Sequence, residues 1–539
     1  VKYSFQRAGA PGGAGPGARR SAAPLPPRMA GPSEGLAGAD GAAAVNGTSL
    51  PSQLPPPAGA VVGNPYPQAW GHTTSYATRS DKIVCVLVGL PARGKSYIAR
   101  RLAQYLSFFY STPCRVFNVA EYRRKQVGGA DSLASEAQLA ELLDEAGEEA
   151  RAQRTRAAEE ALADLCEWMH EAMIPKPKRR RTGCTGTYVS GEFGAVAMYD
   201  STNSTHEQRQ FVVEKLKPTG AKVIFIETIC TDQDMILRNI MASRPEASEA
   251  SDEEKRGLLE AFKKRTAYYE RVYEPVVEKD WSWIKTVDGC EIAMNHIRGF
   301  LPSRIAQFLM NLNLDRRPFF LSRHGQSVYN KLGKIGGDSD LTEHGEEYAQ
   351  ALARWVQTNV KMLDGEPQPA RLWTSSLRRT INTARHISHE HLVLPSGVEW
   401  VQMRPKRFRN LDEIYAGLYD GMTYEEIAEQ FPEEAKARKA DKFEYRYPRG
   451  ESYSDLIARL EPMAHEMERQ RETLMVVAHQ AILRVIYCYL MEKPREMCPE
   501  VGIPLNTVIK LTPTAVGCKE ERFDVIPKRP GVELDPASH

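Results

Sequence analysis

The stretch that decides the fold of this chain is Lys82-Ile-Val-Cys-Val-Leu-Val88, followed at once by Gly89-Leu-Pro-Ala-Arg-Gly-Lys-Ser96. A short, continuous apolar run predicts a buried parallel strand. The glycine-rich pattern then leads into a helical stretch from Tyr97 to Leu106. This strand–loop–helix context is typical of a phosphate-binding loop, whereas a chance glycine-rich turn would lack it. The sequence therefore predicts a nucleotide site at residues 89–96.

Four residues of this loop are the candidate ATP-binding groups. The backbone N–H groups of the loop and the N-terminus of the following helix would face the phosphates. Lys95 would add positive charge and act in catalysis, and the Ser96 hydroxyl could hold Mg²⁺. The predicted nucleotide-binding set is Gly89, Gly94, Lys95 and Ser96.

Three further strands are predicted in the same half, at residues 115–119, 195–199 and 222–226. Helical patterns separate them, which indicates a doubly wound α/β domain built on a parallel sheet. Asp200 ends one of these strands, at the carboxyl edge where such sheets bind ligands. It is the second candidate Mg²⁺ ligand and could instead position an acceptor hydroxyl. The alternative is an ordinary capping aspartate.

A second motif, Arg323-His324-Gly325, follows a predicted strand at residues 319–322. Alone this tripeptide is weak evidence, because a capping or core histidine is commoner. Supporting residues appear downstream in the order of the histidine phosphatase superfamily: Arg379 after a strand, then Glu413, then His479 at a strand end. The set resembles that superfamily and predicts a second α/β domain with a phosphoglycerate mutase-like fold.

This set of residues suits phosphate-ester hydrolysis through a covalent histidine. Neutral His324 would attack the phosphorus atom in line. Arg323, Arg379 and His479 would surround the equatorial oxygens with charge and hydrogen-bond donors. Glu413 would protonate the leaving oxygen and then activate water. No metal or other cofactor is expected in this half, since no ligand cluster accompanies these residues.

Longer motifs in both halves resemble one family, the bifunctional 6-phosphofructo-2-kinase/fructose-2,6-bisphosphatases. The resemblance runs from Lys82 to Cys518 in the order of the family. Beyond the loop and the Arg-His-Gly motif, the matching segments are residues 121–124, 200–205, 239–241, 334–339, 422–427, 447–453 and 480–484. The resemblance implies a chain that makes fructose 2,6-bisphosphate from fructose 6-phosphate and ATP and also hydrolyses it.

The resemblance also implies roles for residues of the first half. Asp200 and Cys230 would lie in the kinase active site, and Asn239 would contact the nucleotide. Contacts with the sugar phosphate are implied for Arg123, Arg154, Thr202, Arg244, Arg265 and Tyr269. For Arg154 the register stays open, because Arg151 and Arg156 compete for the same position.

In the second half the resemblance implies a set of residues that bind the sugar and its other phosphate. These are Asn330, Gly336, Tyr424, Arg438, Lys442, Tyr453, Gln480 and Arg484. Each aromatic residue in this region could instead be ordinary core packing, and Tyr447 is the most plausible example.

Two departures from the family pattern bear on the kinase. Arg244 stands where a lysine is usual, and a planar guanidinium does not replace a point ammonium cleanly. Gln208 stands where an arginine is usual, and Arg209 next to it is turned about 100° around the helix. We therefore expect a working but weak kinase. The alternative is a phosphatase whose kinase half only binds nucleotide.

The chain is expected to divide into four parts: a disordered Ala/Gly/Pro-rich tail at 1–78, a kinase domain at 79–316, a phosphatase domain at 317–520 and a C-terminal tail at 521–539. The tail composition cannot bury enough surface to offset its ordering entropy. Arg19-Arg20 in this segment faintly resembles a transit peptide, which is the alternative for the tail.

The bulk properties limit the partners. The formal net charge of +2 gives no broad basic field, which argues against nucleic acid and against the remote alternative of a polynucleotide kinase–phosphatase. Nine cysteines without paired spacing indicate reduced thiols and a cytoplasmic protein. No apolar run is long enough to span a membrane. A nuclear import signal at 176–181 is a weaker possibility than a solvated loop, and a homodimer is expected by analogy with the family.

Overall fold

The computed structural model describes residues 82–126, 148–171, 194–242 and 269–527, apart from 316, 364, 395–396 and 515–516, together with isolated positions between 257 and 267. Several predictions fall outside these residues. They concern the tail at 1–78, the basic run at 176–181 and the sugar-phosphate contacts Arg244 and Arg265. None of the described helices combines the length and the apolar character needed to cross a membrane.

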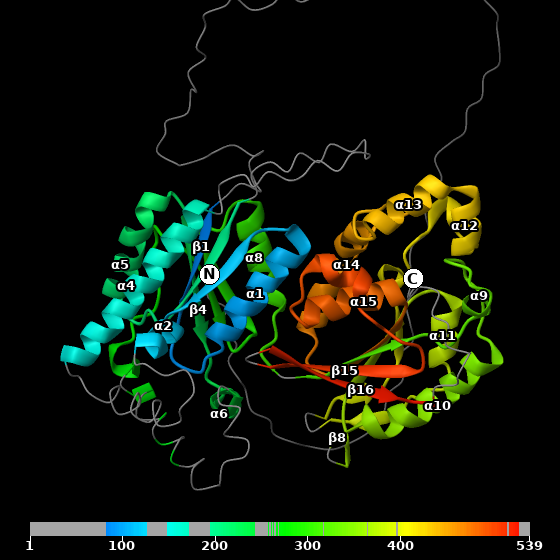
Figure 1. The fold of residues 1–539 in the computed structure, drawn as a ribbon. Helices are drawn as coiled ribbons and strands as arrows, with labels where there is room; N and C mark the ends of the chain where they lie inside the picture. Colours follow the sequence, from blue (N-terminus) through cyan, green and yellow to red (C-terminus); the bar gives the residue numbers. More distant parts are fainter. Residues whose placement is uncertain are drawn as a thin grey trace, which may run out of the picture. The chain divides into compact units, whose positions relative to one another are not determined.

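The first half is built on a six-stranded sheet in the order β2-β3-β1-β4-β5-β6, parallel except for its last strand (Figure 1). This confirms the predicted parallel α/β fold, and every predicted strand coincides with an observed one. The strands are β1 (Ile83–Val88), β2 (Cys114–Asn118), β3 (Val196–Asp200), β4 (Lys222–Ile229), β5 (Ser282–Val287) and β6 (Glu291–Asn295). The helices are α1 (Lys95–Tyr110), α2 (Val119–Gln126), α4 (Glu148–Glu171), α5 (His206–Leu216), α6 (Gln233–Ala242) and α8 (Phe300–Asn311).

Helices cover both faces of this sheet because β1 is apolar at every position. Ile83, Cys85 and Leu87 face a core that includes α1 and α8. The alternate residues Val84 and Val86 face a second core with α2, α4 and α5. Successive side chains of a strand point to opposite faces, so a continuous apolar run is what a doubly covered strand requires.

The second half is built on another six-stranded sheet, in the order β13-β10-β14-β7-β15-β16. The strands are β7 (Phe319–Arg323), β10 (Ala370–Thr374), β13 (Pro405–Arg407), β14 (Thr473–Ala478), β15 (Thr507–Thr514) and β16 (Gly517–Asp524). The first four are parallel, and β15 and β16 are antiparallel additions. β16 therefore continues past residue 520, where the C-terminal tail was expected to begin.

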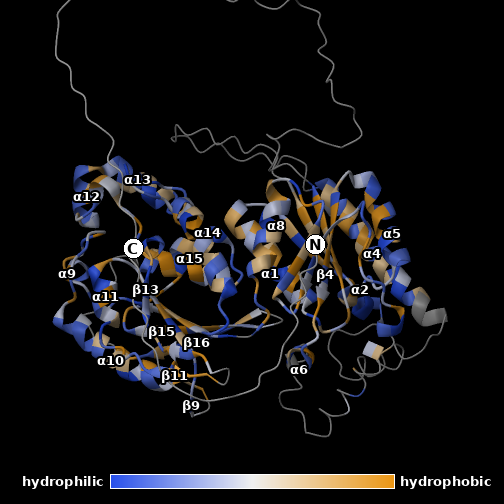
Figure 2. Ribbon diagram, turned by 180° about the vertical axis from the view of Figure 1, so that it is seen from behind, coloured by the Kyte–Doolittle hydropathy of each residue, from blue (hydrophilic) through white to orange (hydrophobic). Residues whose placement is uncertain are grey.

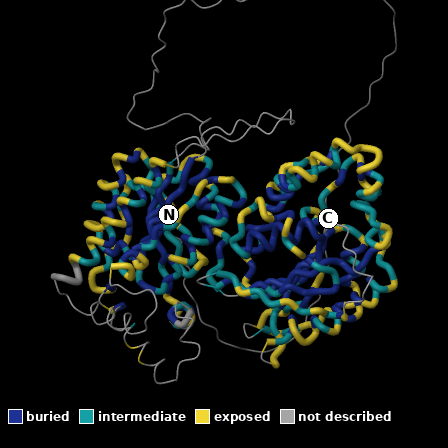
Figure 3. The backbone as a smooth tube through the Cα atoms, in the orientation of Figure 1, coloured by how far each residue is buried: buried dark blue, intermediate teal, exposed yellow. Residues whose placement is uncertain are grey.

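Helices also cover both faces of the second sheet. The main helices are α10 (Glu343–Asn359), α11 (Arg378–Ala384), α14 (Tyr453–Arg469) and α15 (Gln480–Leu490), with shorter α9 (Val328–Lys331), α12 (Tyr424–Gln430) and α13 (Pro432–Ala440). α14 and α15 pack on one face of β7 and β14, and α10 and α11 pack on the other. The inner strands β1, β3, β7 and β14 are buried at every position, and apolar residues gather along the inner strands of both sheets (Figures 2 and 3).

Functional motifs follow the carboxyl ends of the parallel strands in both sheets. The glycine-rich loop follows β1, and Asp200 ends β3. Arg323 ends β7, and His479 comes directly after β14. In open α/β sheets this edge is where ligands bind, so the fold brings residues distant in sequence to one edge of each sheet.

Candidate functional site

The glycine-rich loop of the first half turns tightly between β1 and α1. Gly89 has φ +140°, and a Cβ there would lie 2.5 Å from the Thr228 carbonyl oxygen on β4, so only glycine fits. Gly94, with φ +83°, precedes Lys95 at the start of α1, and no side chain caps that helix end. The N-terminal N–H groups of α1 are therefore left to bind an anion.

Three polar side chains meet at this loop. The Lys95 ammonium donates to the Leu90 carbonyl at 2.6 Å, which folds the side chain back over the loop. The Asp200 carboxylate accepts from the Ser96 hydroxyl and from the Asn118 amide, the latter at 2.7 Å. Burial raises the pKa of Asp200, while Ser96 and Lys95 oppose that rise. A buried carboxylate beside a serine hydroxyl and a lysine is an arrangement that fits a phosphate-bound Mg²⁺, which needs only one or two protein oxygens.

Two further predicted residues bond to the loop through their own segments. The Asn239 amide on α6 donates to the Ala92 carbonyl at 3.1 Å. The Thr202 carbonyl accepts from the Gly89 N–H at 3.1 Å. The structure thus joins Asn239 and Thr202 to the backbone of the loop. No described group of three or more His, Cys, Asp or Glu side chains could hold a metal by itself.

The remaining predicted residues of the first half are placed less directly. Cys230 follows β4 and is buried, and burial raises the pKa of its thiol, so the group stays protonated. Arg123 lies on α2, whose Glu121 is near enough to act on Asp200. Arg154 lies on α4, and Tyr269 is buried.

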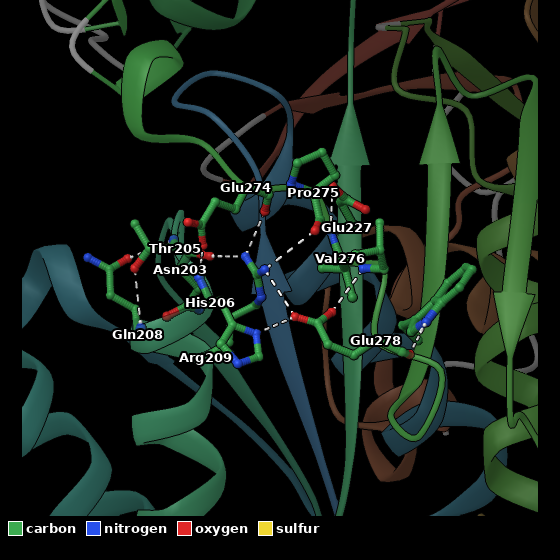
Figure 4. Close-up of polar contacts among 12 residues, drawn as sticks. Asn203, Thr205, His206, Gln208, Arg209, Glu227, Glu274, Pro275, Val276 and Glu278 are labelled. Carbon is green, nitrogen blue, oxygen red and sulfur yellow. Dashed lines mark hydrogen bonds and ion pairs between the residues drawn. The ribbon is translucent and has the colours of Figure 1, made fainter.

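Gln208, which replaces the expected arginine, has a structural role in this protein (Figure 4). It is the third residue of α5, and its side chain accepts from the Thr205 N–H at 3.4 Å while the Thr205 hydroxyl accepts from the Gln208 N–H at 3.3 Å. This reciprocal pair is a capping box, which satisfies two N–H groups at the helix start. Gln208 is thus engaged in holding the helix end.

Arg209 is one of the most buried charged side chains of the first half. Its guanidinium donates to the carbonyls of Glu274 at 2.8 Å and Asn203 at 3.2 Å, and pairs with the Glu278 carboxylate at 3.3 Å (Figure 4). It therefore links the segment after β3 to residues 274–278. Arg209 is buried and Gln208 is exposed, which agrees with the prediction that the two side chains point about 100° apart around the helix.

We expect Arg209→Lys to lower the free energy of unfolding by about 2 kcal/mol, because an ammonium cannot reach all of these oxygens and leaves some of them without a donor. Denaturant unfolding of the purified protein measures this change. Arg238→Lys is the matched control, since the exposed pair of Arg238 with Asp315 should contribute less than about 0.5 kcal/mol. Equal stability of the Arg209→Lys and control variants would contradict the linking role.

In the second half, Arg379 lies between two histidines. Its Nε donates to His324 Nε2 and to His479 Nδ1, each at 3.2 Å. His324 Nδ1 lies 2.8 Å from the Gly325 carbonyl, so Nδ1 carries the proton and Nε2 presents a lone pair. His479 Nε2 lies 2.7 Å from the Ser375 hydroxyl. Arg323 completes the group and donates to the Ile503 carbonyl at 2.9 Å.

Both histidines are held neutral. Burial, Arg379 and Arg323 keep the pKa of His324 well below its ordinary value. The same burial and Arg379 keep the pKa of His479 well below its ordinary value. A neutral imidazole is the form that can attack phosphorus, so the site keeps its candidate nucleophile in the reactive state.

The lowered pKa values predict how stability depends on pH. In the unfolded chain each histidine titrates near about 6.5, so below that pH the unfolded state binds protons that the folded state does not. The stability is fully present above about pH 6.5 and decreases as the pH falls toward the folded pKa values, by up to about 1.4 kcal/mol per pH unit for each histidine.

Replacing one buried histidine should reduce this dependence. We expect His479→Gln to flatten the decline in the free energy of unfolding between about pH 6.5 and about pH 5, measured by urea unfolding at several pH values. His391→Gln, at an exposed position on the short strand β11 (His391–Val393), is the control and should follow the wild type. Parallel curves for His479→Gln and the wild type would show that His479 is not buried in its neutral form.

A cavity of about 130 Å³ opens beside His324. Glu413 lies in its wall, where its carboxylate accepts from the backbone N–H groups of Ile414 at 2.9 Å and Ala481 at 3.3 Å. Every predicted residue of the second half lines this cavity except His479, which accepts a hydrogen bond from Arg379. They are Arg323, His324, Asn330, Gly336, Arg379, Glu413, Tyr424, Arg438, Lys442, Tyr453, Gln480 and Arg484.

Part of the cavity wall is basic. Arg438 donates to the Tyr424 and Tyr447 hydroxyls, each at 3.0 Å, and Arg484 donates to the Tyr453 hydroxyl at 3.2 Å. Burial together with Arg438 and Arg484 lowers the pKa of Lys442. Three basic side chains that line one cavity are typical of a site for a multiply charged anion. Tyr447 thus combines core packing with a contact to Arg438.

Gly336 shapes the same cavity through its backbone. It has φ +70°, and a Cβ there would lie 1.5 Å from the Asp420 carboxylate. Its neighbour Gly337 accepts from Arg379 Nη1 at 2.6 Å. The close approach of this segment to Asp420 and Arg379 therefore requires glycine.

The sequence analysis missed two residues that hold this site together. Ser375 follows β10 and bonds His479, and the Thr383 hydroxyl on α11 accepts from the Gly325 N–H at 2.9 Å. Ser375 could have been found by the same reasoning that identified Asp200, since it also lies at the carboxyl end of a parallel strand. Thr383 carries no such sequence signal.

Comparisons with known proteins find a matching family for each half of the chain. Residues 71–173 and 185–316 match the 6-phosphofructo-2-kinase family, and residues 319–525 match the histidine phosphatase superfamily, branch 1. The chain is 37% identical over 460 residues to the 6-phosphofructo-2-kinase/fructose-2,6-bisphosphatase of Aquarana catesbeiana, covering 84% of this chain and 87% of the relative. It is 38% identical over 456 residues to isoform 1 of Mus musculus, covering 84% and 86%.

A longer relative and a solved structure are also similar. The chain is 39% identical over 455 residues to the Arabidopsis thaliana 6-phosphofructo-2-kinase/fructose-2,6-bisphosphatase, covering 82% of this chain and 54% of the relative. The alpha-ribazole phosphatase of Shigella flexneri is 21% identical, with a TM-score of 0.32, covering 38% of this chain and 96% of that one.

Proposed function

Because this chain belongs to the 6-phosphofructo-2-kinase/fructose-2,6-bisphosphatase family, we propose that the two sites described above perform its two opposing reactions. The protein is a bifunctional enzyme that makes fructose 2,6-bisphosphate and hydrolyses it. The observation that carries the assignment of residues is the presence on one chain of the Lys95–Ser96–Asp200 group and of the two histidines bonded by Arg379. Family membership leaves the polynucleotide alternative without support.

In the kinase half, ATP is proposed to bind with its phosphates against the loop of Gly89 and Gly94 and the N-terminus of α1. Lys95 neutralises phosphate charge, and Asn239 keeps the loop in place through Ala92. Ser96 and Asp200 are the residues that would hold Mg²⁺, which when bound supplies positive charge to the phosphates. Asp200 also lies where it can orient the acceptor hydroxyl of the sugar.

Fructose 6-phosphate is proposed to bind next to Asp200 in this half. The residues assigned to it on the strength of the family resemblance are Arg123, Arg154, Thr202, Arg244, Arg265 and Tyr269. Cys230 is proposed to shape this site through packing, because its thiol is kept protonated by burial. The phosphoryl group then moves from ATP to O2 of the sugar, and the hydroxyl proton leaves with Asp200 or water.

In the phosphatase half, His324 Nε2 is proposed to attack the phosphorus of the 2-phosphate once its lone pair no longer accepts from Arg379 Nε. The bond between phosphorus and O2 of the sugar breaks, and Glu413 gives its proton to that oxygen. Arg323 and Arg379 stabilise the charge on the equatorial oxygens, and His479 supports them by accepting from Arg379 Nε. Glu413 then takes a proton from water, whose oxygen attacks the phosphohistidine and releases inorganic phosphate.

The second phosphate of the substrate is proposed to bind at the basic part of the cavity wall. Arg438, Lys442 and Arg484 supply charge there, and the hydroxyls of Tyr424 and Tyr453 orient the two arginines. Asn330 and Gln480 line the wall near the sugar, and Gly336 brings the backbone close. A sugar bisphosphate can use both His324 and these cations, whereas a monophosphate can use only one of the two.

The substrate assignment is tested at Lys442. We expect Lys442→Ala to raise KM for fructose 2,6-bisphosphate about tenfold or more with little change in kcat, because a charge-assisted contact made equally before and during the reaction is lost. Steady-state hydrolysis measures both constants. Lys439→Ala, an exposed lysine on α13, is the control. An unchanged KM for Lys442→Ala would place the second phosphate elsewhere.

The wider setting is proposed from the family and from composition. ATP use follows from the kinase family, and Mg²⁺ is proposed with it. A cytoplasmic location is proposed because every cysteine in the described part of the chain is free. A homodimer is proposed by analogy with the family. Small phosphorylated sugars and ATP are the proposed partners, with no nucleic acid or membrane.

A further inference from the structure

Glu413 stands on a turn whose backbone decides where its carboxylate lies. The turn begins with the short helix η3 (Arg409–Leu411) and ends at Glu413 itself. The described contacts of the carboxylate are made to backbone N–H groups, those of Ile414 and Ala481. A small shift of the turn would therefore move the carboxylate relative to His324.

The guanidinium of Arg459, on α14, binds this turn at several points. Its Nη1 donates to the carbonyls of Asp412 at 2.9 Å and of Arg409 and Asn410 at 3.3 Å. Its Nη2 donates to the carbonyl of Glu413 at 3.4 Å. In return, the Asn410 amide donates to the Arg459 carbonyl at 2.9 Å. One side chain thus contacts the backbone of nearly the whole turn.

Glu451 completes this arrangement on the far side of Glu413. Its carboxylate pairs with Arg459 at 3.0 Å and accepts from the Tyr415 N–H at 3.0 Å. On the opposite side, Asp412 accepts from the N–H and the hydroxyl of Ser376, both at 2.7 Å. The turn is therefore fixed from both sides, by Ser376 near Arg379 and by the Arg459–Glu451 pair.

We propose that Arg459 is a positioning residue for the hydrolysis, acting with Glu451 to hold the Glu413 carboxylate within reach of the leaving oxygen. This inference rests on the proposed role of Glu413 as the proton donor. A planar guanidinium can serve several carbonyl oxygens at once, which a lysine ammonium in the same place cannot do. Arg459 lines the larger cavity of about 710 Å³ that shares Glu413 with the substrate cavity, and it lines no part of the substrate cavity itself.

The choice of substrate separates positioning of a proton donor from general damage. The alkoxide of a sugar leaves only with a proton, so its release depends on Glu413. The phenolate of p-nitrophenyl phosphate leaves without one. Misplacing Glu413 should therefore slow formation of the phosphohistidine from fructose 2,6-bisphosphate. Formation of the phosphohistidine from p-nitrophenyl phosphate should keep its rate.

The experiment compares Arg459→Lys, Glu413→Gln and the double variant in the full-length protein. Single-turnover release of the sugar or the phenolate is measured with each substrate. We expect Arg459→Lys to slow sugar release roughly ten- to a hundredfold, because a catalytic group displaced by about 1 Å loses activity on that scale. Phenolate release should stay within about twofold of the wild-type rate. The double variant should be no slower than Glu413→Gln, since residues that act through one another are not additive.

Two controls accompany these variants. Arg469→Lys changes an exposed arginine on the same helix, paired only with Glu466 among its described contacts, and should leave both rates unchanged. Synthesis of fructose 2,6-bisphosphate by the other half reports whether each variant is folded. If Arg459→Lys loses synthesis too, Glu451→Gln takes its place, with the same pattern expected at a smaller size.

The outcomes distinguish this inference from the proposed function. Equal slowing of both substrates by Arg459→Lys, or by Glu451→Gln in its place, would overturn the positioning role, as would slowing that adds fully to that of Glu413→Gln. If Glu413→Gln does not slow sugar release more than phenolate release, the proton-donor role is overturned, and with it this inference. If Glu413→Gln slows sugar release and spares phenolate release while Arg459→Lys leaves sugar release unchanged, only the positioning role of Arg459 fails.

Discussion

Hydrolysis of fructose 2,6-bisphosphate by a His324→Ala variant is expected to fall by at least about a thousandfold, because the attacking nitrogen is removed. His324 Nε2 lies 3.2 Å from Arg379 Nε and has no proton, since Nδ1 is bonded to the Gly325 carbonyl. No neighbouring nitrogen can replace it, as His479 directs Nδ1 to the same arginine. Synthesis in the other half should continue, so the variant should accumulate the bisphosphate.

The measurement follows both reactions of the variant on the same preparation. Substrate labelled at the 2-phosphate should leave label on the wild-type protein after acid-free quenching, and none on His324→Ala. His391→Ala, at an exposed position in the same half, is the control and should keep the label. A His324→Ala variant that still hydrolyses the bisphosphate at about a tenth of the wild-type rate would exclude the covalent histidine.

Replacing Lys95 by methionine is expected to have the second largest effect, lowering synthesis by about a hundred- to a thousandfold. Lys95 is the residue of the loop that we propose neutralises the phosphates, and its ammonium lies over the loop, where it donates to the Leu90 carbonyl. Methionine keeps much of the length and the apolar body while removing the charge. Hydrolysis should be unchanged, because the cavity beside His324 contains no residue of this loop.

Synthesis is measured for this variant by transfer of label from ATP to fructose 6-phosphate. Lys125→Met, at an exposed position near the end of α2, is the matched control and should keep wild-type synthesis. Equal loss in both variants, or full synthesis by Lys95→Met, would mean that the loop does not handle the phosphates as proposed.

Several residues that the sequence identified follow the ends of parallel strands. The apolar run at 83–88 and the glycines after it predicted both the strand and the loop, because buried parallel strands and tight turns each leave a local signal. Asp200 was identified by its place at a strand end, and His324 and His479 by the order of the histidine phosphatase motifs, which also lie at strand ends. Their convergence at a sheet edge is a property of the fold, and it needs no knowledge of distant contacts.

Other parts of the sites depend on contacts between segments far apart in sequence, which local patterns do not reveal. At Gln208 the family resemblance predicts the loss of a substrate contact, and the structure adds a capping box with Thr205. The Thr205-x-x-Gln208 spacing is itself a local signal of that capping box. Arg459 lies 46 residues from Glu413 in sequence, and nothing in its own neighbourhood signals that it holds the turn.

The chemistry expected from the sequence requires a neutral His324, but the sequence does not show what keeps His324 and His479 neutral or that Cys230 stays protonated. Burial decides whether a thiol or an imidazole carries charge, and burial is known only once the chain is folded. Burial raises the pKa of Cys230, whereas burial and Arg379 lower the pKa values of His324 and His479. The chemistry proposed for each site depends on a protonated Cys230 thiol and on neutral His324 and His479 side chains.

The most direct test of the account is a paired assay on one purified preparation of the wild-type chain and of Arg244→Lys. It follows transfer of ³²P from [γ-³²P]ATP to fructose 6-phosphate and, after removal of ATP, release of that ³²P as inorganic phosphate. The account predicts both steps in the wild type, with only a modest change in synthesis for Arg244→Lys. Release of phosphate from added fructose 2,6-bisphosphate without any synthesis by the wild type would contradict it.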